Sequence, residues 1–354
     1  MSGKLYIHCG LHKTGTTALQ TWLASNDAAL KAAGWLFPKT GRIGPHSGQH
    51  NLAWELTRDR RFAFRFGHFP RLRAEIEGFD GDVILSSEDF ESLLPHPDRW
   101  GPIVRLAHDL GRSLVLVIYL REQGAYLESL YYQCLKAGLG EEYRAYAREA
   151  LALGAIARRE WAFQFDYLRA ATQAARLPGC QLILRNYHAL EGASVVADFF
   201  SALGLPPDLL DSDDPELRVH LREQPDVALT RFYRNRIGRA LNPAERHALE
   251  RLAALAPTHA TPPSVATDLA ARFGPGNAAL CDRYGIDQTG LVSSGPAAPG
   301  EGRSNLARVF SLETQLAVSG VARRLADAHN PTGSADMAAA ERQAQDWADW
   351  TREW

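Results

Sequence analysis

The stretch that decides the fold lies near the start of the chain: Lys4-Leu5-Tyr6-Ile7-His8-Cys9, Gly10-Leu11-His12-Lys13-Thr14-Gly15-Thr16-Thr17, Ala18-Leu19-Gln20-Thr21-Trp22-Leu23. Its first part is a short apolar run with β-branched and aromatic members, which predicts a buried strand. Its last part has apolar residues at helical spacing. A strand, a glycine loop and a helix in this order point backbone N–H groups and a helix N-terminus at one place, and that arrangement favours an anion.

The loop differs from a Walker A loop in the position of its lysine. Gly10 and Gly15 keep the glycine spacing of G-x-x-x-x-G-K-[ST], but Lys13 lies two residues before the second glycine. The lysine therefore enters from the loop, and Thr16 and Thr17 add hydroxyl donors at the start of the helix. The pattern predicts a phosphate-binding loop, and an ordinary glycine-rich turn is the alternative.

Composition excludes several classes of protein. The chain has 354 residues, 45% hydrophobic and 23% charged, which is typical of a globular enzyme. A formal net charge of −2 gives no reason to expect a nucleic acid as partner. No run approaches membrane-spanning length and no signal peptide precedes the first strand, so we expect a cytoplasmic protein without an integral membrane segment. Four cysteines without C-x-x-C spacing are expected to be free thiols: Cys9, Cys134, Cys180 and Cys281.

Two further apolar runs predict strands of a central parallel sheet. Residues 82–87 form the first run, and Glu88 and Asp89 follow it directly. Residues 113–120 form the most hydrophobic run of the chain, which ends in Arg121. Ligands of open parallel sheets gather beyond the carboxyl ends of the strands. The predicted fold is a three-layer α/β/α arrangement that brings these charged residues to one edge of the sheet.

The second half of the chain is predicted to be mainly helical. Helices are expected over 141–176, 226–240 and 243–256, with two short ones over 264–284. By composition, residues 293–303 form a Gly/Pro-rich linker between an α/β domain, 1–292, and a helical extension, 304–354. Three tryptophans near the end of the extension share one helix face, which predicts docking against the body or a second copy of the chain.

Three motifs in order resemble those of the sulfotransferases that use 3′-phosphoadenosine-5′-phosphosulfate (PAPS). Their loop P-K-[ST]-G-T-T, which binds the 5′-phosphosulfate, is matched by residues 12–17. A strand ending in arginine, with serine eight residues on, binds the 3′-phosphate, and Arg121 and Ser129 match it. A strand followed by Tyr187 and a helix that ends in Leu-Gly matches the third motif. The resemblance covers about residues 4–205 and is strongest to bacterial members.

The resemblance implies a P-loop-like sulfotransferase fold and an enzyme that moves a sulfuryl group from PAPS to a hydroxyl. The acceptor would be a carbohydrate, a lipid or a small molecule, and 3′,5′-adenosine bisphosphate would be released. Lys13 would stabilise the leaving nucleotide, and Tyr187 is expected to stack on the adenine. No metal is expected, because no triphosphate needs neutralising. The residues implied to hold the nucleotide are His12, Lys13, Thr14, Gly15, Thr16, Thr17, Arg121, Ser129 and Tyr187.

The acceptor hydroxyl must lose its proton, so a general base is expected. Glu88 is the first candidate, because the family places its base just after the strand that precedes the 3′-phosphate strand. A carboxylate that only favours a helix dipole is the alternative for this residue. His50 is the second candidate, since it lies in a glycine-rich loop of the kind that often carries function.

The sequence also departs from the family, and two other functions stay open. Ala18 stands where classical members carry a tryptophan, His188 stands for a glutamate, and no R-K-G stretch is found. A P-loop kinase or nucleotide-binding enzyme would share the strand, loop and helix, although the lysine position argues against it. A non-catalytic binding protein on a sulfotransferase scaffold is the other alternative.

Overall fold

The computed structural model describes residues 3–45, 47–158, 161–190, 194–210, 225–255 and 261–292. The predicted linker 293–303, the extension 304–354 and its tryptophan face lie outside the described residues. The chain divides into two compact units. The first unit is built from Met1–Glu122, Gly154–His220 and Phe273–Val292, and the second from Gln123–Leu153, Leu221–Arg272 and Ser293–Trp354.

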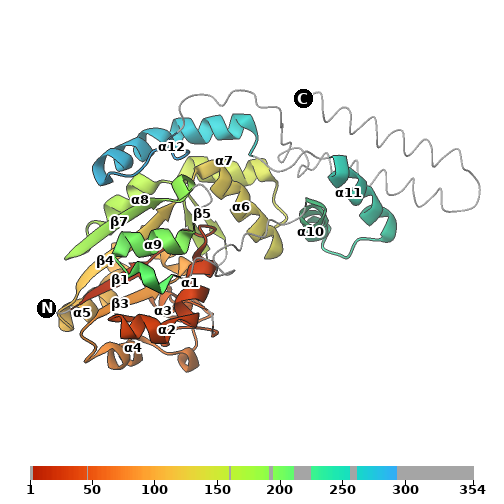
Figure 1. Cartoon of the computed structure of the whole chain (residues 1–354). Coiled ribbons are helices and arrows are strands. Elements are labelled where there is room, and N and C mark those ends of the chain that lie inside the picture. Colours follow the sequence, from red (N-terminus) through yellow and green to blue (C-terminus); the bar gives the residue numbers. More distant parts are fainter. Residues whose placement is uncertain are drawn as a thin grey trace, which may run out of the picture. The chain divides into compact units, whose positions relative to one another are not determined.

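The first unit is organised around a five-stranded parallel sheet in the order β2-β3-β1-β4-β7 (Figure 1). Its strands are β1 Lys4–His8, β2 Trp35–Leu36, β3 Asp82–Ser86, β4 Ser113–Leu120 and β7 Cys180–Asn186. The register places Ile7 between Leu85 and Leu116. Every residue of β4 after its first is buried, which confirms the prediction of a strand covered on both faces.

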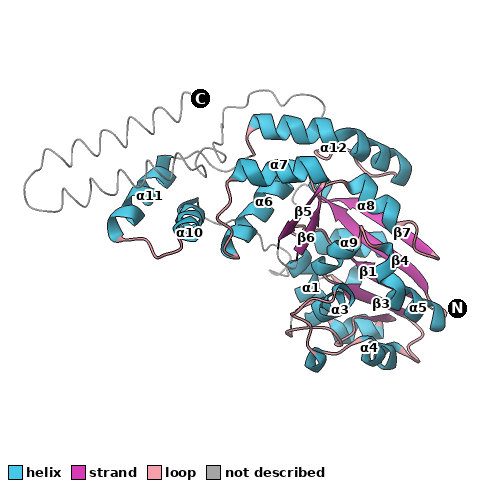
Figure 2. Cartoon of the chain, turned by 180° about the vertical axis from the view of Figure 1, so that it is seen from behind, coloured by secondary structure: helices cyan, strands magenta, loops and turns pink. Residues whose placement is uncertain are grey.

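Helices cover both faces of this sheet (Figures 1 and 2), which confirms the predicted three-layer α/β/α architecture. On one face an apolar core joins the sheet to α1 (Thr16–Ser25), α2 (Asp27–Ala32) and α9 (Val195–Leu203). On the other face α5 (Gly101–Asp109) contacts β4, and α8 (Tyr167–Ala174) contacts β7. The other elements of this unit are α3 His50–Thr57, α4 Phe69–Ile76, η1 Phe64–Phe66, η2 Glu88–Leu93, η3 Pro97–Trp100, η4 His188–Leu190 and η5 Pro207–Leu209.

The strand order creates a topological switch point at the carboxyl ends of β1 and β4. From β1 the chain runs to β2 on one side of the sheet, and from β4 it runs to β7 on the other side. Adjacent strands whose connections leave in opposite directions define a topological switch point, where ligands of open α/β sheets bind. The loop after β1 and the arginine after β4 both lie at this point.

The structure corrects the prediction that residues 141–176 are helical. Helix α7 (Tyr143–Leu153) is followed by an antiparallel hairpin of β5 (Ala155–Arg158) and β6 (Trp161–Gln164), and only then by α8. The helix stops because Gly154 adopts a left-handed conformation, with φ of 65°, which favours glycine. Phe163 and Phe165, which lie in this segment, are fully buried.

The prediction of two short helices over 264–284 is wrong, because a single helix, α12 (Pro263–Tyr284), runs through Pro275. Proline removes one hydrogen bond of the helix, but tertiary packing outweighs this local preference. A side chain at Gly276 would contact Leu168 of α8, with Cβ 3.3 Å from the leucine Cβ, so the helix packs closely just after the proline.

The second unit is helical. It contains α6 (Gln123–Lys136), α7, α10 (Pro225–Ile237), α11 (Pro243–Leu255) and the start of α12. The side chain of Asn235 donates to the carbonyls of Leu135 and Leu139, both at 2.8 Å, and so joins α10 to the end of α6. Helices α10 and α11 confirm the predictions over 226–240 and 243–256. No helix of the described residues is long and apolar enough to cross a membrane.

Candidate active site

The loop between β1 and α1, residues 9–15, has a tightly packed backbone. Lys13 is exposed and adopts a left-handed conformation with φ of 67°, which is unusual for a residue with a side chain. Gly15 has φ of 79° and directly precedes α1. A Cβ atom at Gly15 would lie 2.9 Å from Cγ1 of Val195 in α9, so both its conformation and its neighbour require glycine.

The three threonine hydroxyls of this loop have different environments. Thr14 is buried and donates to the Leu11 carbonyl at 2.6 Å, which closes the loop on itself. Thr17 is exposed. Thr16 is 4% exposed, and its Oγ1 has no hydrogen-bond partner among the described residues. A Cβ atom at Gly10 would lie 2.8 Å from that Oγ1, so the hydroxyl lies against the loop backbone at the start of α1. Such an unsatisfied buried hydroxyl is a candidate ligand contact.

The side chain of Glu91 holds the loop between β1 and α1 in place. Its carboxylate is fully buried, and Oε2 accepts from the His12 backbone N–H at 3.0 Å and lies 2.8 Å from the imidazole Nδ1. Oε1 accepts from the Gln164 N–H of β6 at 2.6 Å. Burial lowers the pKa of His12, but the hydrogen bond to Glu91 and the nearby carboxylates outweigh burial and raise it. The His12 side chain therefore positions the loop.

Arg121 and Tyr187 meet the loop at the carboxyl edge of the sheet. The Arg121 guanidinium donates to the Lys13 carbonyl, and its Cζ lies 5.6 Å from the centre of the Tyr187 ring. The Tyr187 N–H donates to the Leu120 carbonyl at 2.8 Å, and the Tyr167 hydroxyl donates to the Arg121 carbonyl at 2.5 Å. The fold thus brings together three residues predicted from distant parts of the sequence. Ser129 belongs to α6 of the second unit, and its pairing with Arg121 stays a prediction.

The two predicted base candidates also lie together. The Nδ1 atom of His50 lies 2.9 Å from the Ser87 hydroxyl, 3.2 Å from Asp89 Oδ2 and 3.9 Å from Glu88 Oε2. Three of these residues follow β3, and His50 begins α3. We call His50, Ser87, Glu88 and Asp89 the acid–base cluster.

The segment before His50 is attached to the end of β3 by a reciprocal pair of hydrogen bonds. The Gln49 N–H donates to the Ser86 carbonyl, and the Ser86 N–H donates to Gln49 Oε1, both at 2.8 Å. Gly48 approaches so closely that a Cβ atom there would lie well inside van der Waals contact of the Ser86 carbonyl oxygen. These contacts bring His50 to the carboxyl edge of the sheet.

Gln20 connects the β1–α1 loop region to the acid–base cluster. It lies in α1, one turn after Thr16, and is 3% exposed. Its Nε2 donates to Glu88 Oε2 at 3.1 Å and to the Ser86 hydroxyl at 3.4 Å. The same hydroxyl lies 2.8 Å from Nδ1 of His8, which is fully buried. The helix that begins in the loop therefore also fixes the Glu88 carboxylate.

Burial and pairing shift the pKa values of the cluster. Burial lowers the pKa of His50, but the hydrogen bond to Asp89 and the charges of Glu88 and Asp89 outweigh it and raise the pKa above its usual value. Burial raises the pKa of Asp89, but the hydrogen bond to His50 and the nearby cations, including Arg61, hold it below its usual range. The pair therefore favours an ionised aspartate beside a histidine of increased basicity.

Sequence reasoning did not select Gln20, Asp89 or Glu91 as site residues. The acidic run after β3, Glu88-Asp89-Phe90-Glu91, was a usable signal, because carboxylates directly after a buried strand are unusual. Gln20 gave no comparable signal, since a glutamine in an amphipathic helix has no distinctive pattern.

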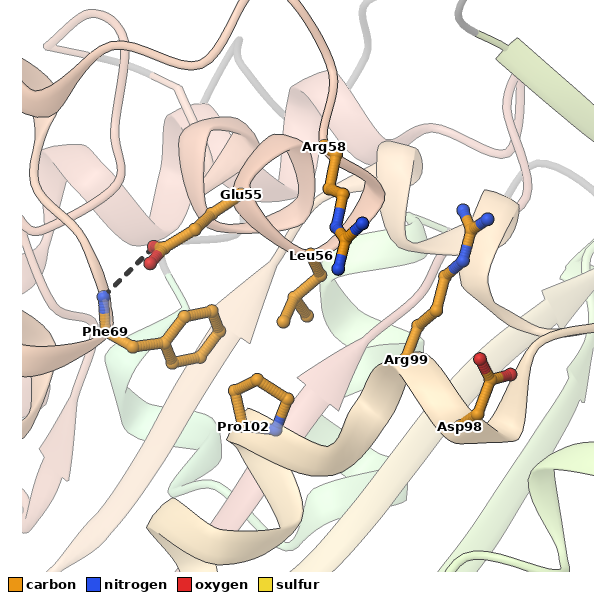
Figure 3. A pocket seen from close by; sticks show the side chains of 7 residues that line it. All are labelled: Glu55, Leu56, Arg58, Phe69, Asp98, Arg99 and Pro102. Atoms are coloured by element: carbon orange, nitrogen blue, oxygen red, sulfur yellow. Dashed lines mark hydrogen bonds between the residues drawn. The ribbon is translucent and has the colours of Figure 1, made fainter.

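A cavity of about 530 Å³ lies elsewhere in the first unit, between the end of α3 and the start of α5 (Figure 3). It contains none of the predicted site residues. Its side chains carry two positive and two negative charges over an apolar floor, and Glu55 accepts from the Phe69 N–H at 3.1 Å. The lining residues are Glu55, Leu56, Arg58, Phe69, Asp98, Arg99 and Pro102.

Comparisons of the chain with family models, with curated proteins and with solved structures find no match. Among the described residues, no group of three or more His, Cys, Asp or Glu side chains is placed to hold a metal ion.

Proposed function

We propose that the chain is a PAPS-dependent sulfotransferase that transfers a sulfuryl group to a hydroxyl of a carbohydrate, lipid or small-molecule acceptor. The observation that carries the proposal is the hydrogen bond from the Arg121 guanidinium to the Lys13 carbonyl. It joins a strand-end arginine to the loop that carries the lysine, at a switch point of the sheet. The resemblance assigns this loop to the 5′-phosphosulfate of the nucleotide and Arg121 to its 3′-phosphate.

The loop has the chemistry that a 5′-phosphosulfate requires. Helix α1 begins at Thr16, so its first backbone N–H groups are donors without helical partners. The unsatisfied Thr16 hydroxyl and the charge of Lys13 add to them. Gly10 and Gly15 let the backbone approach a ligand closely. The Tyr187 ring, beside Arg121, offers an apolar face for the adenine.

The proposed reaction is an in-line displacement at sulfur. The acceptor oxygen bonds to sulfur while the bond from sulfur to the bridging oxygen breaks, and the 5′-phosphate keeps the electron pair. Lys13 stabilises the charge that develops on that phosphate. Arg121 holds the 3′-phosphate through charge-assisted hydrogen bonds, and the role of Ser129 at this phosphate stays what the resemblance implies. The acceptor proton passes to a base in the acid–base cluster, where Glu88 and His50 are the two candidates.

Nucleotide binding tests the proposal directly. We expect 3′,5′-adenosine bisphosphate to raise the melting temperature, because ligand at about 100 times its Kd adds about 2.7 kcal/mol to the free energy of unfolding. Lys13→Ala or Arg121→Ala should abolish the shift in a thermal-shift assay. Lys39→Ala and Arg99→Ala are matched controls, since both side chains are exposed and lie outside the candidate site.

The same assay separates the alternatives. Stabilisation by Mg-ATP and not by the bisphosphate would contradict the proposal and favour a P-loop kinase or nucleotide-binding enzyme. Binding of the bisphosphate without release of sulfate or a sulfated product from PAPS would favour a non-catalytic binding protein on the same scaffold.

A further inference from the structure

The Asp89 carboxylate is held on both of its oxygens. The Trp54 indole N–H donates to Oδ2 at 2.9 Å, and a guanidinium nitrogen of Arg61 lies 3.4 Å from Oδ1. The Asp89 N–H donates to the Ser87 hydroxyl at 3.1 Å. The side chain is 9% exposed, so these donors replace almost all of its solvent. The carboxylate therefore stays charged and has one fixed orientation.

The donors that hold Asp89 are themselves fixed. Arg61 pairs with Asp59, with 2.6 Å between Nη2 and Oδ2, and its Cζ lies 4.6 Å from the centre of the Trp54 ring. The same indole is stacked on the His50 imidazole, with ring centres 6.2 Å apart and planes at 29°. One aromatic side chain thus contacts both the aspartate and the histidine. Such support is needed to hold a functional group within a fraction of an ångström.

The position of Asp89 decides which nitrogen of His50 is basic. An ionised carboxylate only accepts hydrogen bonds, and the Ser87 hydroxyl, 2.9 Å from His50 Nδ1, can accept as well as donate. A proton on Nδ1 therefore satisfies both this hydroxyl and Asp89 Oδ2, which lies 3.2 Å from Nδ1. The lone pair of the neutral ring then lies on Nε2. Within the described part of the chain, Nε2 makes no hydrogen bond, and the side chain keeps an exposed fraction of 11%.

We propose that Asp89 is a positioning residue that orients His50, so that His50 Nε2 takes the proton of the acceptor hydroxyl. This inference rests on the proposed sulfuryl transfer and chooses between its two candidate bases. As the acceptor oxygen bonds to sulfur, its hydrogen passes to Nε2, and the bridging oxygen leaves with the nucleotide. Asp89 stabilises the imidazolium that results. Glu88, whose carboxylate is bound by Gln20 and lies 3.9 Å from Nδ1, adds negative charge beside the ring.

A substrate-free measurement tests the orientation. In the full-length native chain, the ¹⁵N shifts of neutral His50 should report a proton on Nδ1. In Asp89→Asn, the proton should move to Nε2, the form that free imidazole side chains favour. Asp98→Asn removes an exposed carboxylate elsewhere in the unit and should change nothing. Trp54→Phe keeps an aromatic ring but removes the donor to Asp89, and it provides a second variant should Asp89→Asn not fold.

Kinetics test the proton transfer. PAPS turnover should be followed with 2-naphthol or water as acceptor. General-base catalysis contributes about 10²–10⁴-fold, so His50→Gln should lower kcat by at least about 10²-fold and leave binding of the bisphosphate unchanged. Asp89→Asn should lower kcat by about tenfold or more in the native background and by less than twofold in the His50→Gln background. Glu88→Gln should lower kcat by less than tenfold.

The pH profile adds a readout that loss of packing would not produce. The titratable groups that act on His50 are Glu88, Asp89 and His12, and Arg61 acts on Asp89. Turnover by the native chain should rise with pH through the pKa of His50. Loss of the Asp89 charge lowers that pKa, so the rising limb of Asp89→Asn should shift to lower pH while its plateau falls.

Each outcome has a defined meaning. A native His50 with its proton on Nε2, or an Asp89→Asn effect that persists undiminished without His50, would overturn the positioning role. A Glu88→Gln loss that exceeds the His50→Gln loss would assign the base to Glu88. Failure of the bisphosphate to bind would overturn the proposed function, and the ¹⁵N result would then still decide the orientation by itself.

Discussion

At the scale of the residue, burial controls the charge of the histidines around the site. His8, at the end of β1, is fully buried against the rings of Tyr119 and Phe199. Desolvation lowers its pKa to about 3, because a buried imidazolium lacks compensating charge there. His12 and His50 lie beside carboxylates and have raised pKa values. The same side chain thus serves as a neutral core residue in one place and as a candidate base in another.

His8 should make the native state sensitive to mild acid. Below pH 6.5 the unfolded chain protonates this histidine, whereas the native state does not until about pH 3, so stability falls as pH falls through this window. At pH 5 the loss is about 2 kcal/mol, from 1.36 kcal/mol for each unit of pKa difference. The free energy of unfolding in urea at pH 7 and pH 5 should therefore differ less in His8→Gln than in the native chain.

The control for this prediction is His96→Gln, because His96 is exposed. That variant should keep the pH dependence of the native chain. An unchanged pH dependence in His8→Gln would show that His8 does not contribute to acid sensitivity.

At the scale of the element, the segment between β2 and α3 is positioned by contacts with the backbone at the end of β3. The Gln49 N–H donates to the Ser86 carbonyl, the Ser86 N–H donates to the Gln49 side chain, and Gly48 lies directly against the Ser86 carbonyl. Gln49 also donates to the Pro38 carbonyl at 2.7 Å, which closes the loop at its other end. These contacts place His50 beside the carboxylates that follow β3. Helix α3, which begins at His50, does not determine this position by itself.

Gly48→Ala should displace this segment. The added methyl group would overlap a backbone oxygen, which cannot move without disturbing β3, so we expect a loss of about 1–3 kcal/mol in the free energy of unfolding. Gly44→Ala is the matched control, because it lies in the same loop and a Cβ atom there meets nothing within 4 Å. It should change stability by about 0.5 kcal/mol or less. Equal effects of the two variants in urea unfolding would contradict the close approach at Gly48.

At the scale of the whole molecule, the first unit is assembled from three separate stretches of the chain. The last of these stretches, Phe273–Val292, is attached to the sheet by the side chain of Asn186, at the end of β7. Its side-chain amide donates to the carbonyls of Asp287 and Thr289, both at 2.8 Å, and its oxygen accepts from the His188 N–H at 2.9 Å. One buried amide therefore joins segments about one hundred residues apart in sequence.

Asn186→Asp should weaken the attachment of Phe273–Val292 to the end of β7. The variant keeps the acceptor for His188 but sets a carboxylate against two carbonyl oxygens, so we expect a loss of about 2–4 kcal/mol. Hydrogen exchange should accelerate over residues 286–292, as measured by mass spectrometry. Gln181→Glu introduces the same charge at an exposed position of β7 and should leave exchange there unchanged. Unchanged protection of residues 286–292 in Asn186→Asp would contradict the role of the amide.

The sequence predicted the sheet, but only part of the site. Strand positions follow from apolar runs, and parallel strands bring Lys13, Glu88 and Arg121 to one edge wherever their side chains point. The hairpin after Gly154 was missed because four-residue strands give too short an alternation to outweigh a helical pattern. Asp89 and Gln20 act through side-chain contacts across the fold, which no local pattern specifies. The pairing of Arg121 with Ser129 and the linker 293–303 stay predictions.

The left-handed backbone of Lys13 lowers the stability of the chain, whereas the charge of its side chain serves the proposed reaction. A side chain in this conformation costs about 1 kcal/mol relative to glycine. A library at position 13 that is screened for thermal stability should therefore be enriched in glycine and asparagine. The same library screened for the proposed sulfuryl transfer should return lysine, because its ammonium group supplies the positive charge that the leaving phosphate needs. If the two screens select different residues at position 13, Lys13 lowers the stability of the chain while it supports the proposed reaction.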